Sequence, residues 1–244
     1  MKKPLSQIVP FETADGSYTL FDEARGVHYR SHHGAVTESR HVFLGATGLL
    51  ERAGEWIVAE LGFGAAVNFT QTVRAFRERP YVERLTYHTV DWRPVTPDHL
   101  PFHDGEPGDL ARQALELAGE ATAPVRVSSQ DAAIDLILYP TPWENADLQV
   151  DDAQAFFHDP FARNVNPEAW TAETFRWARA ALRDDGRLAT YSAATPVRRA
   201  MFEAGLHVAT APGPGRKREI TVAAPTAEAL DPFELLPRQK YLPT

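Results

Sequence analysis

The feature that most constrains the fold is a regular alternation of strand-like and helix-like segments that begins at Trp56. The apolar run Trp56–Leu61 is typical of a buried strand. It is followed by a turn that contains Gly62 and Gly64, and then by apolar residues at helical spacing that must end before Pro80. Repetition of such a strand–helix unit predicts a parallel sheet with helices on both faces.

The same alternation continues along the chain. Further strand candidates are 85–90, 134–139, 153–157, 187–192, 206–209 and 219–223. Helical patterns fall at 110–118, at 166–182 with Asn166 as cap, and at 195–204, and Asp185-Gly186 predicts a turn. The sequence therefore predicts an α/β fold of Rossmann type with a mostly parallel sheet.

Three regions are predicted from these patterns. Residues 1–50 form an N-terminal extension with a tail, a hairpin from 17–21 and 27–31, and a short helix. Residues 51–225 form the main domain, with a loop and helix inserted at about 94–124. Residues 226–244 form a C-terminal tail.

Composition excludes several classes of function. The 244 residues are 43% hydrophobic and 24% charged, as in ordinary globular proteins. No run of about 18 apolar residues predicts a membrane span, and the start predicts no signal peptide. There is no cysteine, which removes thiolate chemistry and indicates a cytoplasmic protein. The histidines, including His99 and His103, show no spacing typical of a metal site.

The turn after the first strand is the first candidate site, because ligands bind beyond the carboxyl ends of parallel strands. Gly62 and Gly64 allow close approach of a ligand, and the helix N-terminus favours an anionic group. Glu60 suits a cationic amino group, and Asp91 suits ribose hydroxyls. This pattern favours S-adenosylmethionine (SAM) over a dinucleotide, for which Val67 stands in place of the third glycine. A tight turn with a surface glutamate is the structural alternative.

A longer ordered set of motifs supports the same interpretation. It comprises Glu60-Leu61-Gly62-Phe63-Gly64, Asn68-Phe69, Ala155–Ala162, Asn166–Trp170, Leu188–Ala194, Val197-Arg198-Arg199 and Gly213–Glu219, with Asp15-Gly16-Ser17, Gly34-Ala35, Glu38 and Val42-Phe43 upstream. Over roughly residues 13–222 the chain resembles the SAM-dependent methyltransferases that complete 5-methylaminomethyl-2-thiouridine at the tRNA wobble position. The resemblance implies a Rossmann-like class I methyltransferase fold, here expected as the stand-alone form without the flavin-dependent oxidase domain.

The resemblance also implies site residues. Methylation of the 5-aminomethyl group needs a group that accepts a proton from the amine or orients its lone pair. We expect Asp159 to be that group, with capping of the next turn before Pro160 as the alternative. Phe161 is expected to contact the base or the methionine part of SAM, with a core role as the alternative. The expected SAM-binding residues are Glu60, Gly62, Phe63, Gly64, Asn68, Asp91, Tyr139 and Asp159. The sequence departs from the family at Ala66, where a third glycine is usual, and at Tyr139-Pro140, which follows the strand where Gly-Asp is usual.

An acidic chain needs a local basic patch to hold RNA, since its net charge is −8. The candidates are Arg198, Arg199, Arg216, Lys217 and Arg218, which we expect to contact phosphates of a tRNA anticodon stem-loop. A solvated charged face is the alternative. Two other functions remain open: a catalytically decayed SAM- or RNA-binding protein and a dinucleotide-dependent oxidoreductase. The sequence predicts no metal and no membrane partner, and it leaves the oligomeric state open.

Overall fold

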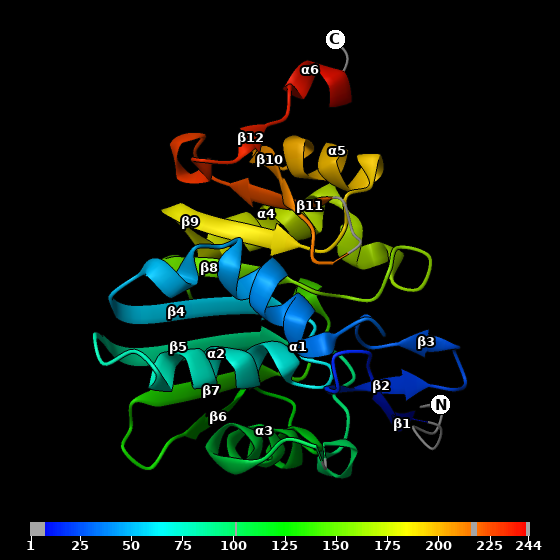
Figure 1. The fold of residues 1–244 in the computed structure, drawn as a ribbon, viewed down its shortest axis with the longest axis vertical. Coiled ribbons are helices and arrows are strands. Elements are labelled where there is room, and N and C mark those ends of the chain that lie inside the picture. Colours follow the sequence, from blue (N-terminus) through cyan, green and yellow to red (C-terminus); the bar gives the residue numbers. More distant parts are fainter. Residues whose placement is uncertain (1–7, 101, 216–218, 243–244) are drawn as a thin grey trace.

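Five parallel strands form the centre of the structure, a computed structural model that describes residues 8–100, 102–215 and 219–242. They are β4 (Gly54–Leu61), β5 (Val82–Val90), β7 (Ile134–Tyr139), β8 (Ala153–His158) and β9 (Leu182–Thr190). The strands that flank this centre are antiparallel to their neighbours: β6 (Val125–Ser128), β10 (His207–Pro212), β11 (Glu219–Ala224) and β12 (Glu234–Leu235). The order across the nine-stranded sheet is β12-β10-β11-β9-β8-β4-β5-β7-β6 (Figure 1). The predicted α/β fold with a mostly parallel sheet is confirmed.

Helices cover both faces of this sheet (Figure 1). On one face lie α2 (Val67–Arg77) and α3 (Gly105–Ala118), and on the other α4 (Ala172–Ala181) and α5 (Thr195–Glu203). The alternation of side chains along β4 separates two apolar cores. Trp56 and Val58 pack with residues of α2 and α3, whereas Ala59 and Leu61 pack with residues of α4 and α5.

The N-terminal region forms a separate antiparallel sheet of β1 (Ile8–Glu12), β2 (Tyr18–Asp22) and β3 (Val27–His28). The predicted hairpin is therefore confirmed. The short helix α1 (Ala35–Glu38) follows and continues directly into a π-helical segment, η1 (Ser39–Gly45). The small sheet projects beyond the end of the main sheet at which β4 and β5 finish (Figure 1). This position brings the N-terminal region to the edge where a ligand is expected.

Several predicted boundaries were wrong. The helix after residue 166 begins at Ala172, because the Thr171 side chain accepts a hydrogen bond from the Thr174 N–H, while Pro167–Trp170 forms a separate 3-10 turn. The expected turn at Asp185-Gly186 is a bulge inside β9: Ala153 pairs with Leu182 but Ala155 pairs with Arg187.

The insertion and the C-terminal region also differ from expectation. The inserted helix begins at Gly105, before the predicted start at residue 110, with Asp104 at the N-cap position. In the C-terminal region β12 adds an edge strand, and α6 (Arg238–Tyr241) packs near α5, where the ring of Tyr241 lies 5.3 Å from that of Phe202. No helix in the described ranges is long and apolar enough to cross a membrane.

Candidate active site

The turn between β4 and α2 is a tight backbone loop that contains two glycines with positive φ angles. Gly62 has a φ of +99°, and a Cβ at this position would lie 2.6 Å from the carbonyl oxygen of Asp159. Gly64 also has a positive φ, and its N–H donates to Asp91 Oδ2 at 3.0 Å. The loop after β4 is thus packed directly against the loop after β8, which makes a side chain at Gly62 sterically incompatible with the site.

Ala66, at the position where the resemblance leads one to expect glycine, lies at the N-cap of α2 with a φ of +56°. A left-handed conformation is unfavourable for alanine by roughly 1–2 kcal/mol. The departure from the family pattern therefore preserves the shape of the turn at a cost in backbone strain.

Asp91 follows β5 and connects two loops through its carboxylate. Oδ2 accepts the Gly64 N–H and Oδ1 accepts the Arg93 N–H, both at 3.0 Å. Burial raises the pKa of this carboxyl. The Phe63 N–H also donates to this carboxylate, so three of its four lone pairs are used. The fourth is compatible with the expected hydrogen bond from a ribose hydroxyl, which stays a prediction.

Three of the expected site residues form a continuous buried hydrogen-bonded chain. The Asn68 side-chain amide donates to Glu60 Oε1 at 2.8 Å and to Asp159 Oδ2 at 3.0 Å. Ser39 Oγ donates to Asn68 Oδ1 at 2.7 Å, and Thr89 Oγ1 donates to Glu60 Oε2 at 2.9 Å. Both oxygens of Glu60 are therefore bonded inside the protein. Burial raises the pKa of Glu60 to about 7, against the hydrogen bond from Asn68.

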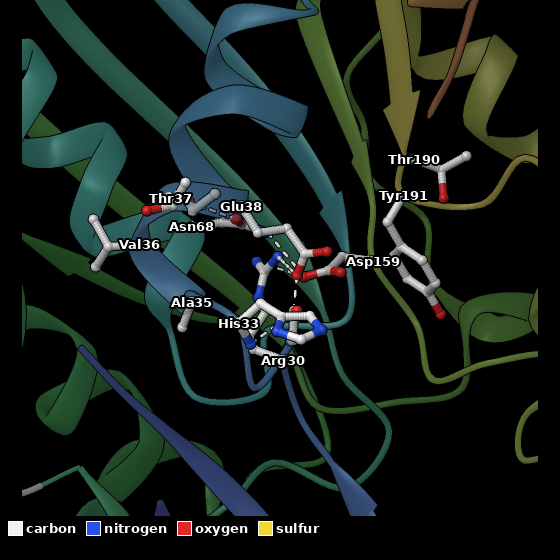
Figure 2. Close-up of polar contacts among 12 residues, drawn as sticks. Arg30, His33, Ala35, Val36, Thr37, Glu38, Asn68, Asp159, Thr190 and Tyr191 are labelled. Atoms are coloured by element: carbon white, nitrogen blue, oxygen red, sulfur yellow. Dashed lines mark hydrogen bonds and ion pairs between the residues drawn. The ribbon is translucent and has the colours of Figure 1, made fainter. Parts of the chain in front are cut away.

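Asp159 is the meeting point of this chain and the N-terminal region (Figure 2). Arg30 Nη2 lies 2.6 Å from Asp159 Oδ2, and Arg30 Nη1 lies 3.8 Å from Glu38 Oε2. Figure 2 shows the guanidinium of Arg30 beside the carboxylates of Glu38 and Asp159. Burial is the largest cause of a raised pKa at Asp159, and the charge of Arg30 opposes it.

The charges of this cluster do not balance. Glu38, Glu60 and Asp159 contribute three carboxyl groups, whereas Arg30 contributes one cation. Buried charges are stable only when they are paired or when their pKa values shift, so this cluster favours a cationic ligand. SAM carries an ammonium and a sulfonium cation beside one carboxylate. The donor set therefore fits this cofactor: the carboxylates suit its cations, and the N-terminus of α2 suits its carboxylate.

Two aromatic residues with expected roles lie near this end of the sheet. Phe161 is half-buried, and the ring of Tyr29 packs edge-on against it at 4.9 Å. Tyr139 is buried at the end of β7, where its hydroxyl donates to the Leu148 carbonyl oxygen at 2.9 Å. The predicted contacts of Phe161 and Tyr139 with ligand stay predictions. Phe63, also expected in the cofactor site, is buried and packs near Phe69 at 6.1 Å.

The expected basic strip is only partly described. Arg198 points inward, with Nε donating to Thr221 Oγ1 at 3.1 Å and Nη2 lying 3.2 Å from Glu219 Oε1. Contact with a phosphate would require Arg198 to leave these partners. Arg199 is exposed, with its Nε donating to the Tyr241 carbonyl oxygen at 3.0 Å. Arg216, Lys217 and Arg218 lie outside the described residues.

Arg30 was not expected in the site from the sequence, and Glu38 was expected only through the resemblance. No local motif marks Arg30, because it lies in the loop after β3 and reaches Asp159 across 129 positions of the chain. One electrostatic signal could have indicated a missing cation: several acidic residues were expected at one edge of the sheet, and no basic residue was expected beside them. Within the part of the chain that the structure describes, no group of three or more metal-ligating side chains is found.

Comparisons with known proteins agree with this geometry. A family model for S-adenosyl-L-methionine-dependent methyltransferases matches residues 111–226. The tRNA 5-methylaminomethyl-2-thiouridine biosynthesis bifunctional protein MnmC of Ralstonia nicotianae is 35% identical over 208 residues, which are 80% of this chain and 31% of that protein. Its counterpart from Cupriavidus metallidurans is 35% identical over 207 residues, with the same shares. The chain thus spans about a third of the length of these relatives.

Solved structures show the same fold. MNMC2 from Aquifex aeolicus has a TM-score of 0.71 at 24% identity, covering 90% of this chain and 71% of that one. Spermidine synthase from Thermotoga maritima has a TM-score of 0.53 at 11% identity, covering 93% and 72%.

The fold, the site and these matches together define a SAM-dependent methyltransferase. Within this class, the chain belongs to the family formed by the methyltransferase part of the 5-methylaminomethyl-2-thiouridine biosynthesis proteins, as the resemblance predicted.

Proposed function

We propose that this chain methylates the primary amine of 5-aminomethyl-(2-thio)uridine at the wobble position of tRNA, with SAM as the methyl donor. The names of its relatives supply the substrate class, and one observation in the site carries the proposal. That observation is a buried, charge-unbalanced carboxylate cluster, with Asp159 at the carboxyl end of β8 beside the loop after β4.

Asp159 is suited to accept a proton from an amine. Among the described residues, its polar side-chain contacts with Arg30 and Asn68 both fall on Oδ2. Oδ1 is thereby left to receive a ligand. The substrate amine is an ammonium ion near neutral pH and must lose one proton before its lone pair can attack. Asp159 Oδ1 is placed to accept that proton first, which leaves a neutral amine whose lone pair can then attack the methyl group.

SAM, when bound, supplies the activated methyl group. The protein contributes the position of the two reacting groups, which replaces a bimolecular encounter by a defined approach. The hydrogen bonds of Asn68 with Glu60 and Asp159 fix the Asp159 carboxylate relative to the glycine turn. Glu60 orders Asn68 from within the protein, and its direct contact with a bound cation stays a prediction.

The RNA partner is proposed to be the anticodon stem-loop. A base in a loop can leave its stack and enter a protein pocket more easily than a paired base. Arg199 is exposed on α5 and is available to a phosphate. We propose that Arg216, Lys217 and Arg218 also bind phosphates of the RNA. The half-buried Phe161 is proposed to contact the entering base.

The test is transfer of labelled methyl from SAM to tRNA that carries 5-aminomethyluridine, with unmodified tRNA as the control substrate. We expect label in the modified tRNA and none in the control. Calorimetry with SAM and with tRNA is run in parallel. Binding of tRNA without binding of SAM would identify a decayed enzyme, and binding of NADH would identify a dinucleotide-dependent protein.

A further inference from the structure

Arg30 is a buried arginine that the transfer of a methyl group to an amine does not itself require. It is 8% exposed, and its guanidinium lies over the ring of Phe43, 4.9 Å from the ring centroid. Nη2 is 2.6 Å from Asp159 Oδ2. The side chain is therefore packed in place rather than lying across an open surface.

The burial of Arg30 is not explained by a complete set of hydrogen bonds. Nη1 is buried and has no hydrogen-bond partner in the described part of the protein, and the nearest carboxylate oxygen recorded for it, Glu38 Oε2, is 3.8 Å away. An unsatisfied buried donor is costly. The favourable contribution of Arg30 must therefore be its charge, which acts on the surrounding carboxylates.

The groups around Asp159 come from every neighbouring element. Glu38 lies at the end of α1, and Glu60 lies on β4. The phenols of Tyr87 on β5 and Tyr191 after β9 also interact electrostatically with Asp159, and burial raises the pKa of both, so that they are neutral. Asn68 contributes an uncharged amide. Among the described groups that act on Asp159, Arg30 is the cation.

We propose that Arg30 is a positioning residue for amine methylation: its charge favours the carboxylate form of Asp159, and it holds Oδ2, so that Oδ1 remains the proton acceptor. The expected effect of Arg30 on the rate of methylation rests on the proposed function. Its expected effect on the titration of Asp159 does not. Glu38 and Phe43 hold the guanidinium against Asp159.

The consequence is a dependence on pH that a purely structural arginine would not produce. Burial and the charges of Glu38 and Glu60 raise the pKa of Asp159, and Arg30 lowers it. Without Arg30, Asp159 binds its proton more tightly and becomes unable to accept another at neutral pH. The loss of activity should then be reversed by raising the pH.

The first measurement is a pH titration of the Asp159 carboxyl by ¹³C NMR in protein labelled at aspartate, with Asp159→Asn to assign the signal. In Arg30→Met we expect the pKa to rise by about one unit or more, a tenfold change in proton affinity. Arg30→Lys, which keeps the charge, should show a smaller rise and serves if Arg30→Met does not fold. Arg84→Met is the matched control, because Arg84 pairs with Asp135 near the opposite end of β5.

The second measurement is the pH profile of methyl transfer. We expect the acidic limb to move to higher pH in Arg30→Met by the amount seen in the titration, with at least about tenfold lower kcat at pH 7 and recovery at alkaline pH. An unchanged titration, or a loss of activity that is uniform across pH, would overturn the inference. If the unmutated protein transfers no methyl, the proposed function fails, whereas the titration still decides the role of Arg30.

Discussion

Two buried arginines, one in the loop after β3 and one on α5, show how one residue type acquires different roles. Arg30 is 8% exposed and Arg198 is 6% exposed. Each has a carboxylate close to Nη2, at 2.6 Å for Arg30 and 3.2 Å for Arg198. By burial and pairing alone, the two sites look alike.

The surroundings distinguish them. Arg30 is close to Asp159 and Glu38, with Glu60 one hydrogen-bonded step further, and all these carboxyl groups are largely buried. The partner of Arg198 is Glu219, whose side chain is 45% exposed and therefore solvated. An excess of buried negative charge creates a site for a cation and a proton. A single solvated ion pair, such as the one between Arg198 of α5 and Glu219 of β11, only stabilises the packing of two elements.

The largest expected effect comes from comparing substitutions of the two carboxylates that pair with these arginines, Asp159 and Glu219. Asp159→Asn removes the proposed proton acceptor, and we expect kcat for methyl transfer to fall about 10²–10⁴-fold. Binding of SAM, measured by calorimetry, should remain because the other expected cofactor residues are intact. Glu219→Gln is the matched control, and we expect it to change kcat by less than about twofold, since exposed ion pairs contribute little.

Equal losses of activity in these two variants would contradict the comparison, because both carboxylates would then act through structure. A near-normal rate in Asp159→Asn would remove this residue as the proton acceptor. The site would then require another group for that step.

The second prediction concerns stability, and it separates the buried acidic cluster from the solvated pair. Burial raises the pKa of Glu60 from 4.5 to about 7. A group with a raised folded pKa gives stability that is complete below pH 4.5 and is lost as the pH rises through 7. Glu60 should therefore lower the free energy of unfolding by roughly 3 kcal/mol between pH 4.5 and pH 8. Urea unfolding across this range measures it.

Glu60→Gln keeps the size of the side chain and removes its proton equilibrium. We expect its unfolding free energy to vary less with pH than that of the unmutated protein. Glu219→Gln, with the acid in a solvated position, should leave the slope unchanged. Parallel slopes for the unmutated protein and Glu60→Gln would show that Glu60 is not the titrating group.

The sequence predicts the carboxylate cluster near Arg30 better than it predicts the surroundings of Arg198. Strand–helix alternation places Glu60 and Asp159 at the ends of two parallel strands, and the sheet order brings β4 and β8 together. Asn68 follows from its place in the first turn of α2. These three residues are indeed hydrogen-bonded to one another. Arg30 could not be placed in this way, because its loop lies outside the repeating pattern.

Arg198 was expected on a phosphate-binding strip because it is one of several basic residues in the last third of the chain. Its helical spacing contained a contrary signal: Phe202, four residues later, is buried on the same side of α5. The decisive partner, Thr221, comes from β11 and accepts from Arg198 while donating to the Ser192 carbonyl oxygen. Helical periodicity describes the faces of one helix, so it could not predict this contact between α5 and β11.

The third prediction tests whether Arg198 stabilises the packing of α5 against β11. Arg198→Met removes the bond to Thr221 and the pair with Glu219, and we expect it to lower the free energy of unfolding by about 1–2 kcal/mol. The figure is modest because Glu219 is solvated. Thermal or urea unfolding measures it. The Asp159 titration should not move, in contrast to Arg30→Met; a shift there would show that the two arginines share one electrostatic network.

The smallest expected effect separates backbone strain from charge in the region of Arg30. Ala66 begins α2 with a φ of +56°, and Ala66→Gly relieves a conformation that glycine adopts without steric cost. Glycine also has a more flexible unfolded state, so we expect a net gain of at most about 1 kcal/mol in the free energy of unfolding. Urea unfolding at pH 7 measures it, with Ala132→Gly, another alanine with positive φ that lies in the turn before β7, as the matched control.

The pKa of Asp159 should stay the same in both variants, since neither changes a charge. A stabilised protein with an unmoved Asp159 titration would show that the turn sets the shape of this region while Arg30 sets its protonation.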